Sequence, residues 1–323
     1  MDEFTRKIRA QMEPFLDFDS RTNPAQMVNN YDWLGSMGAI ELMRDVGKHF
    51  PVPYMLAKDS VKSRLETGIS YTEFSYMILQ AYDFLELYRR HDCELQVGGS
   101  DQWGNITAGS DLIRRAVGGS CFGLTCPLVT TADGTKFGKT EAGAIWLSPE
   151  RTTPYEFYQF WVNTDDRSVV SYLKVFTFLS VDEILQLEET VTTNPGAREA
   201  QRVLAHEVTV LVHGEQTALK AEKISRALFY GELHALAEDE LQLAFHDVPT
   251  HTMAGEEQAL VDLLVAAGVS SSKRQARQDI SQNAISLNGD RCTDESHTVR
   301  KIDGLHGKYI VVRRGKNKYF LIQ

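Results

Sequence analysis

Apolar side chains in the first 147 residues alternate between helix-like and strand-like spacing. The pattern predicts short helices over residues 39–50 and 59–66, and a long helix that Thr72 caps and that runs to about Arg90. Apolar residues of the long helix recur every three or four positions and share one face: Phe74, Ile78, Ala81 and Leu85. That face is expected to pack against a core.

Two short apolar runs, over residues 93–97 and 122–129, are predicted to be strands. A glycine-rich loop over residues 98–105 and a helix to about Ala116 separate them, and a charged loop over residues 132–141 follows. The order strand, loop, helix, strand indicates an α/β fold with a parallel sheet. Ligands bind such sheets at the carboxyl ends of the strands, and both loops begin there.

The rest of the chain has a different pattern. Residues 148–244 are predicted to be almost all helical, and residues 245–255 mix Pro, His, Thr and Gly without periodicity, which favours a linker. Residues 256–323 predict a small α+β domain with helices over 257–267 and 272–283 and a strand entering an Asn-Gly turn. The predicted division is therefore residues 1–147, 148–244, a linker 245–255, and 256–323.

Charge is unevenly distributed. The net charge is −10, yet residues 268–323 carry 11 basic and 5 acidic side chains, while the remaining 267 residues carry 23 basic and 39 acidic ones. A basic tail on an acidic body favours a polyanion as the partner of the tail. A solvated basic surface without any partner explains the charge equally well.

Composition also bears on location. No run of about 18 apolar residues is present, so no membrane span is indicated, and the N-terminus does not read as a secretory signal. The cysteines, which are Cys93, Cys121, Cys126 and Cys292, lack metal-ligand spacing. They are interpreted as reduced thiols of a cytoplasmic protein.

The charged loop holds Lys136-Phe137-Gly138-Lys139-Thr140. Two lysines with a glycine between them can wrap around a polyanion, because the ammonium is a compact charge and glycine lets the backbone come close. Such cations stabilise charge that builds on pyrophosphate in a transition state. A solvated basic loop is the alternative, and the position just after a predicted strand favours phosphate handling.

The long helix carries polar side chains at positions i, i+4 and i+7, namely Tyr76, Gln80 and Asp83. They form one stripe among large apolar residues, which suits a pocket for a small polar and aromatic ligand. The wet face of a surface helix would give the same spacing.

A third group stands at the end of the first predicted strand. Gly98 and Gly99 allow a ligand to lie against the backbone, Asp101 can accept from a ribose hydroxyl or an ammonium, and Gln96 and Gln102 offer donors and acceptors. A glycine-rich turn in which Asp101 caps the next helix is the alternative.

Taken together, these stretches resemble tyrosyl-tRNA synthetases of the bacterial kind. The resemblance covers essentially the whole chain and rests on residues 29–33, 72–76, 79–83, 98–105, 132–140 and 154–161. It implies a partial Rossmann-like class I synthetase catalytic domain, then a helical domain that contacts the anticodon arm, then a small ribosomal-protein-like RNA-binding domain.

The resemblance also implies an activity and a set of site residues. The expected reaction is ATP-dependent activation of tyrosine to tyrosyl-adenylate, followed by transfer to tRNA(Tyr). Lys136, Lys139 and Thr140 match the mobile phosphate-handling loop. The positions that match the tyrosine site are Tyr76 and Gln80 at the amino end, Asp83 at the phenolic hydroxyl, Gln96 and Gln102 as further contacts, and Asn30 near the amino group. Gly99 and Asp101 match the ribose site of ATP and the adenylate.

One departure from the family pattern is expected to affect activity. Members carry a segment before the position of Phe4 with the first strand and a His-x-Gly-His-type signature, and none of the nine histidines here stands in that arrangement. The chain alone is therefore expected to make little tyrosyl-adenylate. A non-catalytic RNA-binding protein derived from such a synthetase is the alternative.

Partners follow from the same resemblance. We expect a homodimer joined near Tyr71, with one tRNA crossing both subunits, and ATP with Mg²⁺ as a substrate. We expect no dedicated protein metal site, no membrane association and no DNA partner. The candidate phosphate contacts of the basic tail are Lys273, Arg274, Arg277, Arg313, Arg314, Lys316 and Lys318.

Overall fold

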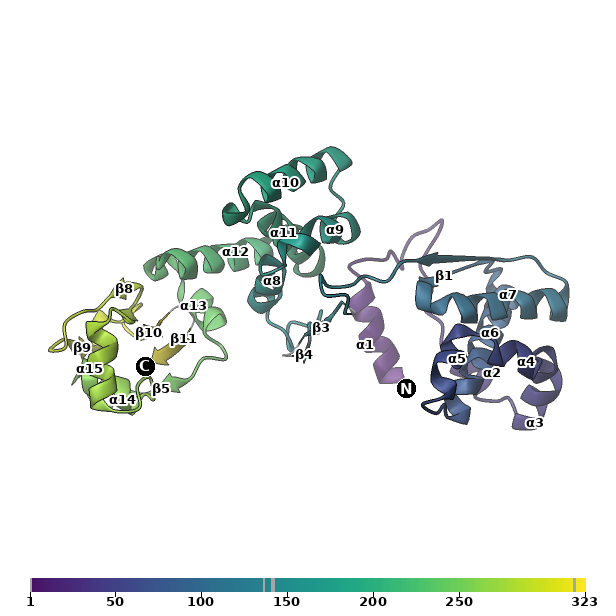
Figure 1. The fold of residues 1–323 in the computed structure, drawn as a ribbon, viewed down its shortest axis with the longest axis horizontal. Coiled ribbons are helices and arrows are strands. Elements are labelled where there is room, and N and C mark those ends of the chain that lie inside the picture. The colour runs from purple at the N-terminus through teal and green to yellow at the C-terminus, as the bar shows by residue number, and fades with distance from the viewer. Residues whose placement is uncertain (1, 136, 141–142, 316–317) are drawn as a thin grey trace. The chain divides into compact units, whose positions relative to one another are not determined.

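The computed structural model describes residues 2–135, 137–140, 143–315 and 318–323 (Figure 1). Backbone contacts divide the chain into two compact units, one that ends at Gly138 and one that begins at Lys139. Within the described ranges, no helix is both long enough and apolar enough to cross a bilayer.

The longest helix of the first unit is α6 (Tyr71–His91), which packs along α7 (Trp103–Val117). Its first residue follows Ser70, whose Oγ accepts from the Glu73 amide at 3.2 Å. The Glu73 carboxylate in turn accepts from the Ser70 amide at 3.0 Å. This capping box corrects the expectation that Thr72 caps the helix, because Thr72 already lies inside the first turn.

A parallel strand pair lies beside these helices. β1 (Leu95–Gly99) and β2 (Phe122–Cys126) run in register from Leu95↔Phe122 to Gly99↔Cys126. The alternation of strand side chains places Leu95, Val97, Phe122 and Leu124 on the same face, and they are 49%, 58%, 62% and 52% exposed. Parallel sheets are normally covered on both faces, so this face is unusual in being open.

The core of the first unit lies between α6, α7 and the short segments before them. Its largest buried side chains include Trp33, Phe84, Leu112 and Ile113. The predicted helix over 39–50 is split into three short pieces of different pitch, and an N-terminal helix that the sequence pattern did not predict precedes them. The short helices are α1 (Asp2–Met12), α2 (Tyr31–Leu34), α3 (Ala39–Glu41), η1 (Leu42–Val46), η2 (Gly47–His49), α4 (Val52–Leu56) and α5 (Asp59–Leu65).

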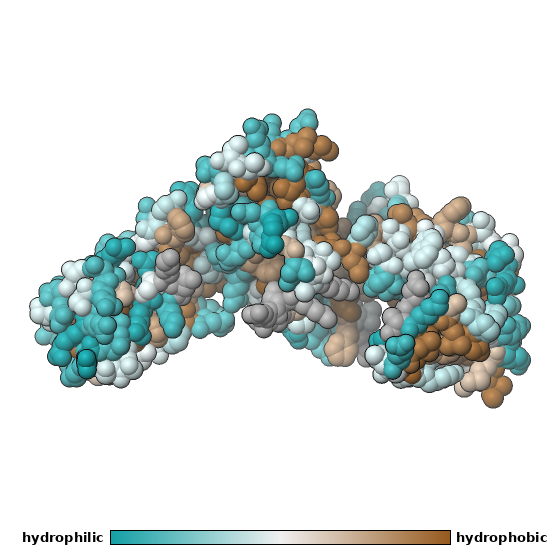
Figure 2. Space-filling view, viewed as in Figure 1, coloured by the Kyte–Doolittle hydropathy of each residue, from teal (hydrophilic) through white to brown (hydrophobic). Residues whose placement is uncertain are grey.

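The second unit opens with a short hairpin and continues as helices. Buried aromatic side chains of α8, Phe157, Tyr158 and Trp161, form the centre of the helical part. Apolar side chains reach the surface of this helical part (Figure 2). Between α9 and α10 Phe178 is 92% exposed, and Val181 at the start of α10 is 73% exposed. The elements are β3 (Lys139–Thr140), β4 (Gly143–Ala144), α8 (Pro154–Val162), α9 (Asp166–Phe176), α10 (Val181–Thr193), α11 (Glu199–His213), α12 (Glu215–Tyr230) and α13 (Glu238–Ala244).

The chain ends in a five-stranded sheet ordered β5-β11-β10-β7-β8. Two helices, α14 (Leu260–Ala266) and α15 (Lys273–Ser281), supply most of its core partners. The Asn288-Gly289 turn between β7 and β8 is present, with positive φ at both residues. The strands are β5 (Thr250–His251), β6 (Glu257–Ala259), β7 (Ile285–Leu287), β8 (Asp290–Arg291), β9 (Thr298–Arg300), β10 (Ile310–Arg314) and β11 (Lys318–Ile322).

Two stretches of this part differ from the sequence pattern. Residues 245–255, which the pattern interprets as a linker, contain β5, which pairs with β11, and the buried side chains of Phe245 and Met253. The predicted helix over 257–267 starts as strand β6, because residues 257–259 pair with β9. Both differences come from long-range strand pairing, which local periodicity does not encode.

Candidate functional site

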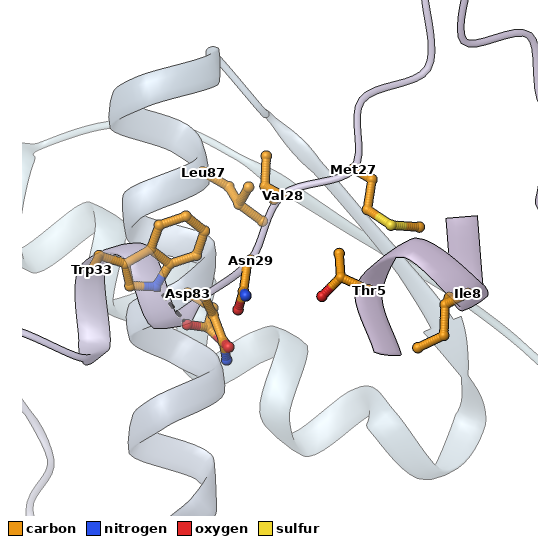
Figure 3. A pocket seen from close by; sticks show the side chains of 9 residues that line it. Thr5, Ile8, Met27, Val28, Asn29, Trp33, Asp83 and Leu87 are labelled. Atoms are coloured by element: carbon orange, nitrogen blue, oxygen red, sulfur yellow. Dashed lines mark hydrogen bonds between the residues drawn. The ribbon is translucent and has the colours of Figure 1, made fainter. Parts of the chain in front are cut away.

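Asp83 on α6 is the centre of the best-defined polar group in the first unit. Its Oδ1 accepts from the indole Nε1 of Trp33 at 2.7 Å, and its Oδ2 accepts from Nδ2 of Asn30 at 3.0 Å (Figure 3). Trp33 is only 5% exposed, so the indole is held within the core. Both carboxylate oxygens therefore have a donor from the same short segment, which orients the carboxylate.

Local structure explains how the segment reaches Asp83. Asn29 Oδ1 accepts from the Tyr31 amide at 3.0 Å, which supports the start of α2. Asn30 and Trp33 stand three positions apart, so their side chains lie on the same face of this single helical turn. Asp83 in turn belongs to the α6 stripe, which begins at Tyr76.

A cavity of about 400 Å³ opens beside this carboxylate. Figure 3 shows Thr5 and Ile8 of α1 on one side of it and Trp33, Asp83 and Leu87 on the other. The complete lining is Thr5, Ile8, Met27, Val28, Asn29, Asn30, Trp33, Asp83 and Leu87. An apolar wall with one anchored carboxylate suits a small ligand that carries a hydroxyl or amine.

The middle of the stripe is linked to the first turn of α7. Nδ2 of Asn105 donates to Oε1 of Gln80 at 3.0 Å and to Oε1 of Gln102 at 3.3 Å. Two of the glutamines singled out from the sequence are thereby brought together by one amide. Tyr76, one turn earlier on α6, is 57% exposed and lines the same helix face.

β1 has two features that fit a bound ligand, one at Gln96 near its start and one at Gly99 at its end. The Oε1 atom of Gln96 is buried and has no hydrogen-bond partner, so it is an unsatisfied acceptor beside the site. A Cβ atom on Gly99 would stand 2.6 Å from Oδ1 of Asp101 and 2.9 Å from a methyl of Leu128. Only glycine leaves the Asp101 carboxylate where it is.

The predicted phosphate loop lies partly outside the described residues. Lys136 lies outside the described residues, and so do the side chains of Lys139 and Thr140. The backbone of Lys139 and Thr140 forms β3, which pairs with β4. The roles expected for these three residues stay predictions.

The structure separates the candidate phosphate contacts of the basic tail. Arg274, Arg277 and Lys318 are exposed, whereas Lys273 is paired with Asp262 at 2.6 Å. Lys316 lies outside the described residues.

Two further candidates lie on β10. Arg313 is half-buried beside Ser286, and Arg314 is tied into the fold by Asp279, which it meets at 2.9 Å.

Trp33 and Asn105 are the contacts that sequence reasoning did not single out. Both stand inside stretches that carry the family resemblance, but no role followed from their type or spacing. The spacing of Asn30 and Trp33 on one face was the available signal for Trp33. Asn30, expected near the substrate amino group, is hydrogen-bonded to Asp83.

A metal site is a separate question. Among the described side chains, no group of three or more His, Cys, Asp or Glu is placed to hold a metal ion.

Comparison with known families agrees with this geometry. A family model described as tRNA synthetases class I (W and Y) matches residues 1–230, and one described as the Tyrosine--tRNA ligase SYY-like C-terminal domain matches residues 240–322. The chain belongs to the tyrosyl-tRNA synthetases. It is thus a class I aminoacyl-tRNA synthetase by family, and the resemblance predicted from the sequence is confirmed.

Curated tyrosyl-tRNA synthetases are similar along nearly the whole chain. Tyrosine--tRNA ligase 1 of Bacillus anthracis is 58% identical over 321 residues, which is 99% of this chain and 77% of that protein. Tyrosine--tRNA ligase of Bacillus pumilus is 58% identical over 325 residues, and Tyrosine--tRNA ligase 2 of Enterococcus faecalis is 55% identical over 321. The function by family is therefore tyrosine--tRNA ligase.

Solved tyrosyl-tRNA synthetase structures share the fold. A C-terminally truncated mitochondrial tyrosyl-tRNA synthetase of Coccidioides posadasii is 33% identical, with a TM-score of 0.55 over 68% of this chain and 65% of that one. The corresponding protein of Aspergillus nidulans is 33% identical with a TM-score of 0.56 over 71% and 66%. The predicted α/β class I catalytic domain, helical region and C-terminal domain are confirmed.

Proposed function

We propose that the group around Asp83 is the tyrosine site of this synthetase, and that Asp83 accepts a hydrogen bond from the phenolic hydroxyl. The observation that carries the proposal is the anchoring of both carboxylate oxygens by Trp33 and Asn30 beside the cavity. A carboxylate held in this way needs no rearrangement to meet a hydroxyl. Phenylalanine would desolvate it without offering a donor, which is costly.

The other site residues follow from their places around the stripe. Tyr76 and Gln80 serve the amino end of tyrosine, and Gln96, with its unpaired Oε1, and Gln102 add contacts. Gly99 and Asp101 hold the ribose of ATP and of the adenylate.

The reaction proposed is that of the family, with ATP as a substrate that carries Mg²⁺. A tyrosine carboxylate oxygen attacks the α-phosphorus of ATP, and the bond from that phosphorus to the bridging oxygen breaks, releasing pyrophosphate. A ribose hydroxyl of tRNA(Tyr) then attacks the acyl carbon, loses its proton, and AMP leaves. Lys136, Lys139 and Thr140 stabilise the charge on the departing pyrophosphate, so catalysis rests on positioning and electrostatics.

Residues 1–323 by themselves are proposed to form little tyrosyl-adenylate. No His-x-Gly-His arrangement occurs among them, although class I chemistry uses such histidines at the phosphates. The face of the sheet that bears Val97 and Phe122 is open, which also supports an incomplete catalytic fold. Pyrophosphate exchange by residues 1–323 at the rate of a family member would contradict this part of the proposal.

Partners and location complete the proposal. The helical part and the basic C-terminal part, divided as in the sequence pattern, hold tRNA(Tyr) through exposed cations such as Arg274, Arg277 and Lys318. Tyr71, which is 72% exposed at the start of α6, lies at the proposed homodimer contact. A cytoplasmic location follows from the tRNA substrate.

The test is calorimetric titration of the chain with tyrosine and with phenylalanine. The parent is expected to bind tyrosine, and Asp83→Ala is expected to lose most of that affinity. Asp32→Ala is the matched control, since Asp32 is an exposed aspartate on α2 beside Trp33. Equal binding by both variants would remove Asp83 from the site. Absence of binding in the parent, with retained tRNA binding, would favour the non-catalytic RNA-binding alternative.

A further inference from the structure

The polar stripe of α6 continues beyond Asp83 to Leu87 and Arg90. Asp83, Leu87 and Arg90 stand at i, i+4 and i+7, so the three side chains leave one face of the helix. The guanidinium carbon of Arg90 lies over the Trp33 ring, 5.5 Å from its centroid. This is within the range of a cation–π contact. Arg90 therefore contacts the face of the Trp33 indole, and Asp83 accepts a hydrogen bond from its N–H.

A buried carboxylate tethers Arg90 in that place. Nε of Arg90 donates to Oε2 of Glu86 at 2.7 Å, and the Glu86 side chain is 6% exposed. Burial by itself raises the pKa of Glu86, but hydrogen bonds from Arg90, Arg89 and Tyr82 outweigh it and hold that pKa below its usual value. An ionised Glu86 thus restrains the Arg90 guanidinium, whose own side chain is 49% exposed.

We propose that Arg90 is a positioning residue for the proposed tyrosine-hydroxyl site, acting on Asp83 through Trp33. The inference rests on the proposed function of Asp83 and adds a cation that touches no substrate. Arg90, through the ring of Trp33, sets the direction and the strength of the hydrogen bond that orients the Asp83 carboxylate.

Two physical effects produce this action. A cation over the face draws electron density from the indole, which makes the N–H a stronger donor to Oδ1 of Asp83. The contact also restricts rotation of the ring, which keeps the N–H directed at the carboxylate. Since Trp33 is buried, both effects act in a medium that screens them less than water does.

The same carboxylate supplies a matched control. Nη1 of Arg89 donates to Oε1 of Glu86 at 3.0 Å, so Arg89 and Arg90 are neighbouring arginines that share one partner. Their exposures are also similar, 43% and 49% of the side chain. Only Arg90 has a described contact with the Trp33 ring. Replacing either arginine leaves Glu86 with one ion pair, so the two variants are expected to lose similar amounts of stability.

The experiment compares Arg90→Gln with Arg89→Gln in the full chain by two readouts. The first is the indole N–H resonance of Trp33 in proton–nitrogen correlation spectra, assigned with Trp33→Phe. The resonance is expected to move upfield in Arg90→Gln and to stay in place in Arg89→Gln. An unmoved resonance in Arg90→Gln, or equal shifts in both variants, would overturn the proposal.

The second readout is the ratio of tyrosine to phenylalanine affinity by calorimetry. Arg90→Gln is expected to lower the ratio about 2- to 5-fold through weaker tyrosine binding, the size of one cation–π contact. Arg90→Lys should recover part of it, because the charge remains while the planar stacking does not. An unchanged ratio would overturn the proposal. If the parent binds no tyrosine, the proposed function fails, and the Trp33 resonance still decides whether Arg90 acts on the indole.

Discussion

Arg314 of β10 meets the carboxylate of Asp279 on α15 at 2.9 Å, and the Asp279 side chain is 7% exposed. Ser270 Oγ and Gln275 Nε2 each donate to the same carboxylate at 2.8 Å, and Arg314 also donates to the Val269 carbonyl at 2.7 Å. This group joins the helix with the exposed cations to the sheet behind it. Arg314 is therefore a structural residue of the basic domain in addition to any contact with RNA.

Loss of this carboxylate should destabilise the C-terminal part of the chain. Asp279→Ala leaves Arg314, Ser270 and Gln275 without their shared acceptor and is expected to lower the free energy of unfolding by about 3 kcal/mol. Urea denaturation measures the change. Asp290→Ala, at the exposed first residue of β8, is the control. A loss for Asp279→Ala no larger than that of the control would contradict the role assigned to the ion pair.

The exposed cations of α15 should act on RNA rather than on stability. If Arg274 and Arg277 each contact a phosphate, then Arg274→Gln and Arg277→Gln should each make the fall of log affinity for tRNA with log salt shallower, by about 1 in slope. Lys273→Gln should change the slope less, because Asp262 already pairs with Lys273 at 2.6 Å. Filter binding at several salt concentrations measures the slopes. If all three variants had the same slope, Arg274 and Arg277 would contribute no more to phosphate binding than the paired Lys273.

The sequence predicted the parts of the fold that depend on local pattern. The stripe of Tyr76, Gln80 and Asp83 on a long helix and the Asn288-Gly289 turn are examples, since helical spacing and turn chemistry are local properties. The edge strand Thr250–His251 could not be predicted, because its identity depends on pairing with β11 about seventy residues later.

The site shows the same limit. Residue types in the stripe indicated a polar ligand, but the carboxylate of Asp83 is oriented by Trp33 and Asn30, fifty and fifty-three positions earlier. The sequence indicates only that Arg90 is a basic residue near the end of a helix. The structure places its guanidinium over the Trp33 ring. Contacts across such separations follow from packing, which no spacing rule contains.

The space at Gly99 should be essential for the nucleotide part of the site. Its backbone, at φ −72° and ψ 162°, suits any residue, so the effect of Gly99→Ala comes from the added methyl against Asp101 and Leu128. Displacing Asp101 is expected to weaken binding of a non-hydrolysable tyrosyl-adenylate analogue about 10-fold or more, the loss of one charged hydrogen bond. Tyrosine alone should bind nearly as before.

Calorimetry with the analogue and with tyrosine separates these two effects. Gly104→Ala is the control, because a Cβ there would meet only Lys58 at an ordinary 3.7 Å. If Gly99→Ala bound the analogue like the parent, Asp101 would not be a ribose contact of the kind proposed.

His213 should make the helical part sensitive to acid. It ends α11, its ring meets Phe157 edge-on at 4.9 Å between centroids, and its Nε2 is buried without a hydrogen-bond partner. Burial lowers the pKa of His213 below the ordinary value of 6.5. The unfolded chain takes up a proton at this side chain below about pH 6.5, while the folded chain does so only at lower pH, so stability falls from pH 6.5 down to the folded pKa. Above pH 6.5 the side chain is neutral in both states and contributes no pH dependence.

His213→Leu should therefore lose less stability than the parent between about pH 7.5 and about pH 5.5, as measured by urea midpoints from circular dichroism. His234→Leu, at an exposed position, is the control, and a parent-like acid loss in His213→Leu would show that another group is responsible.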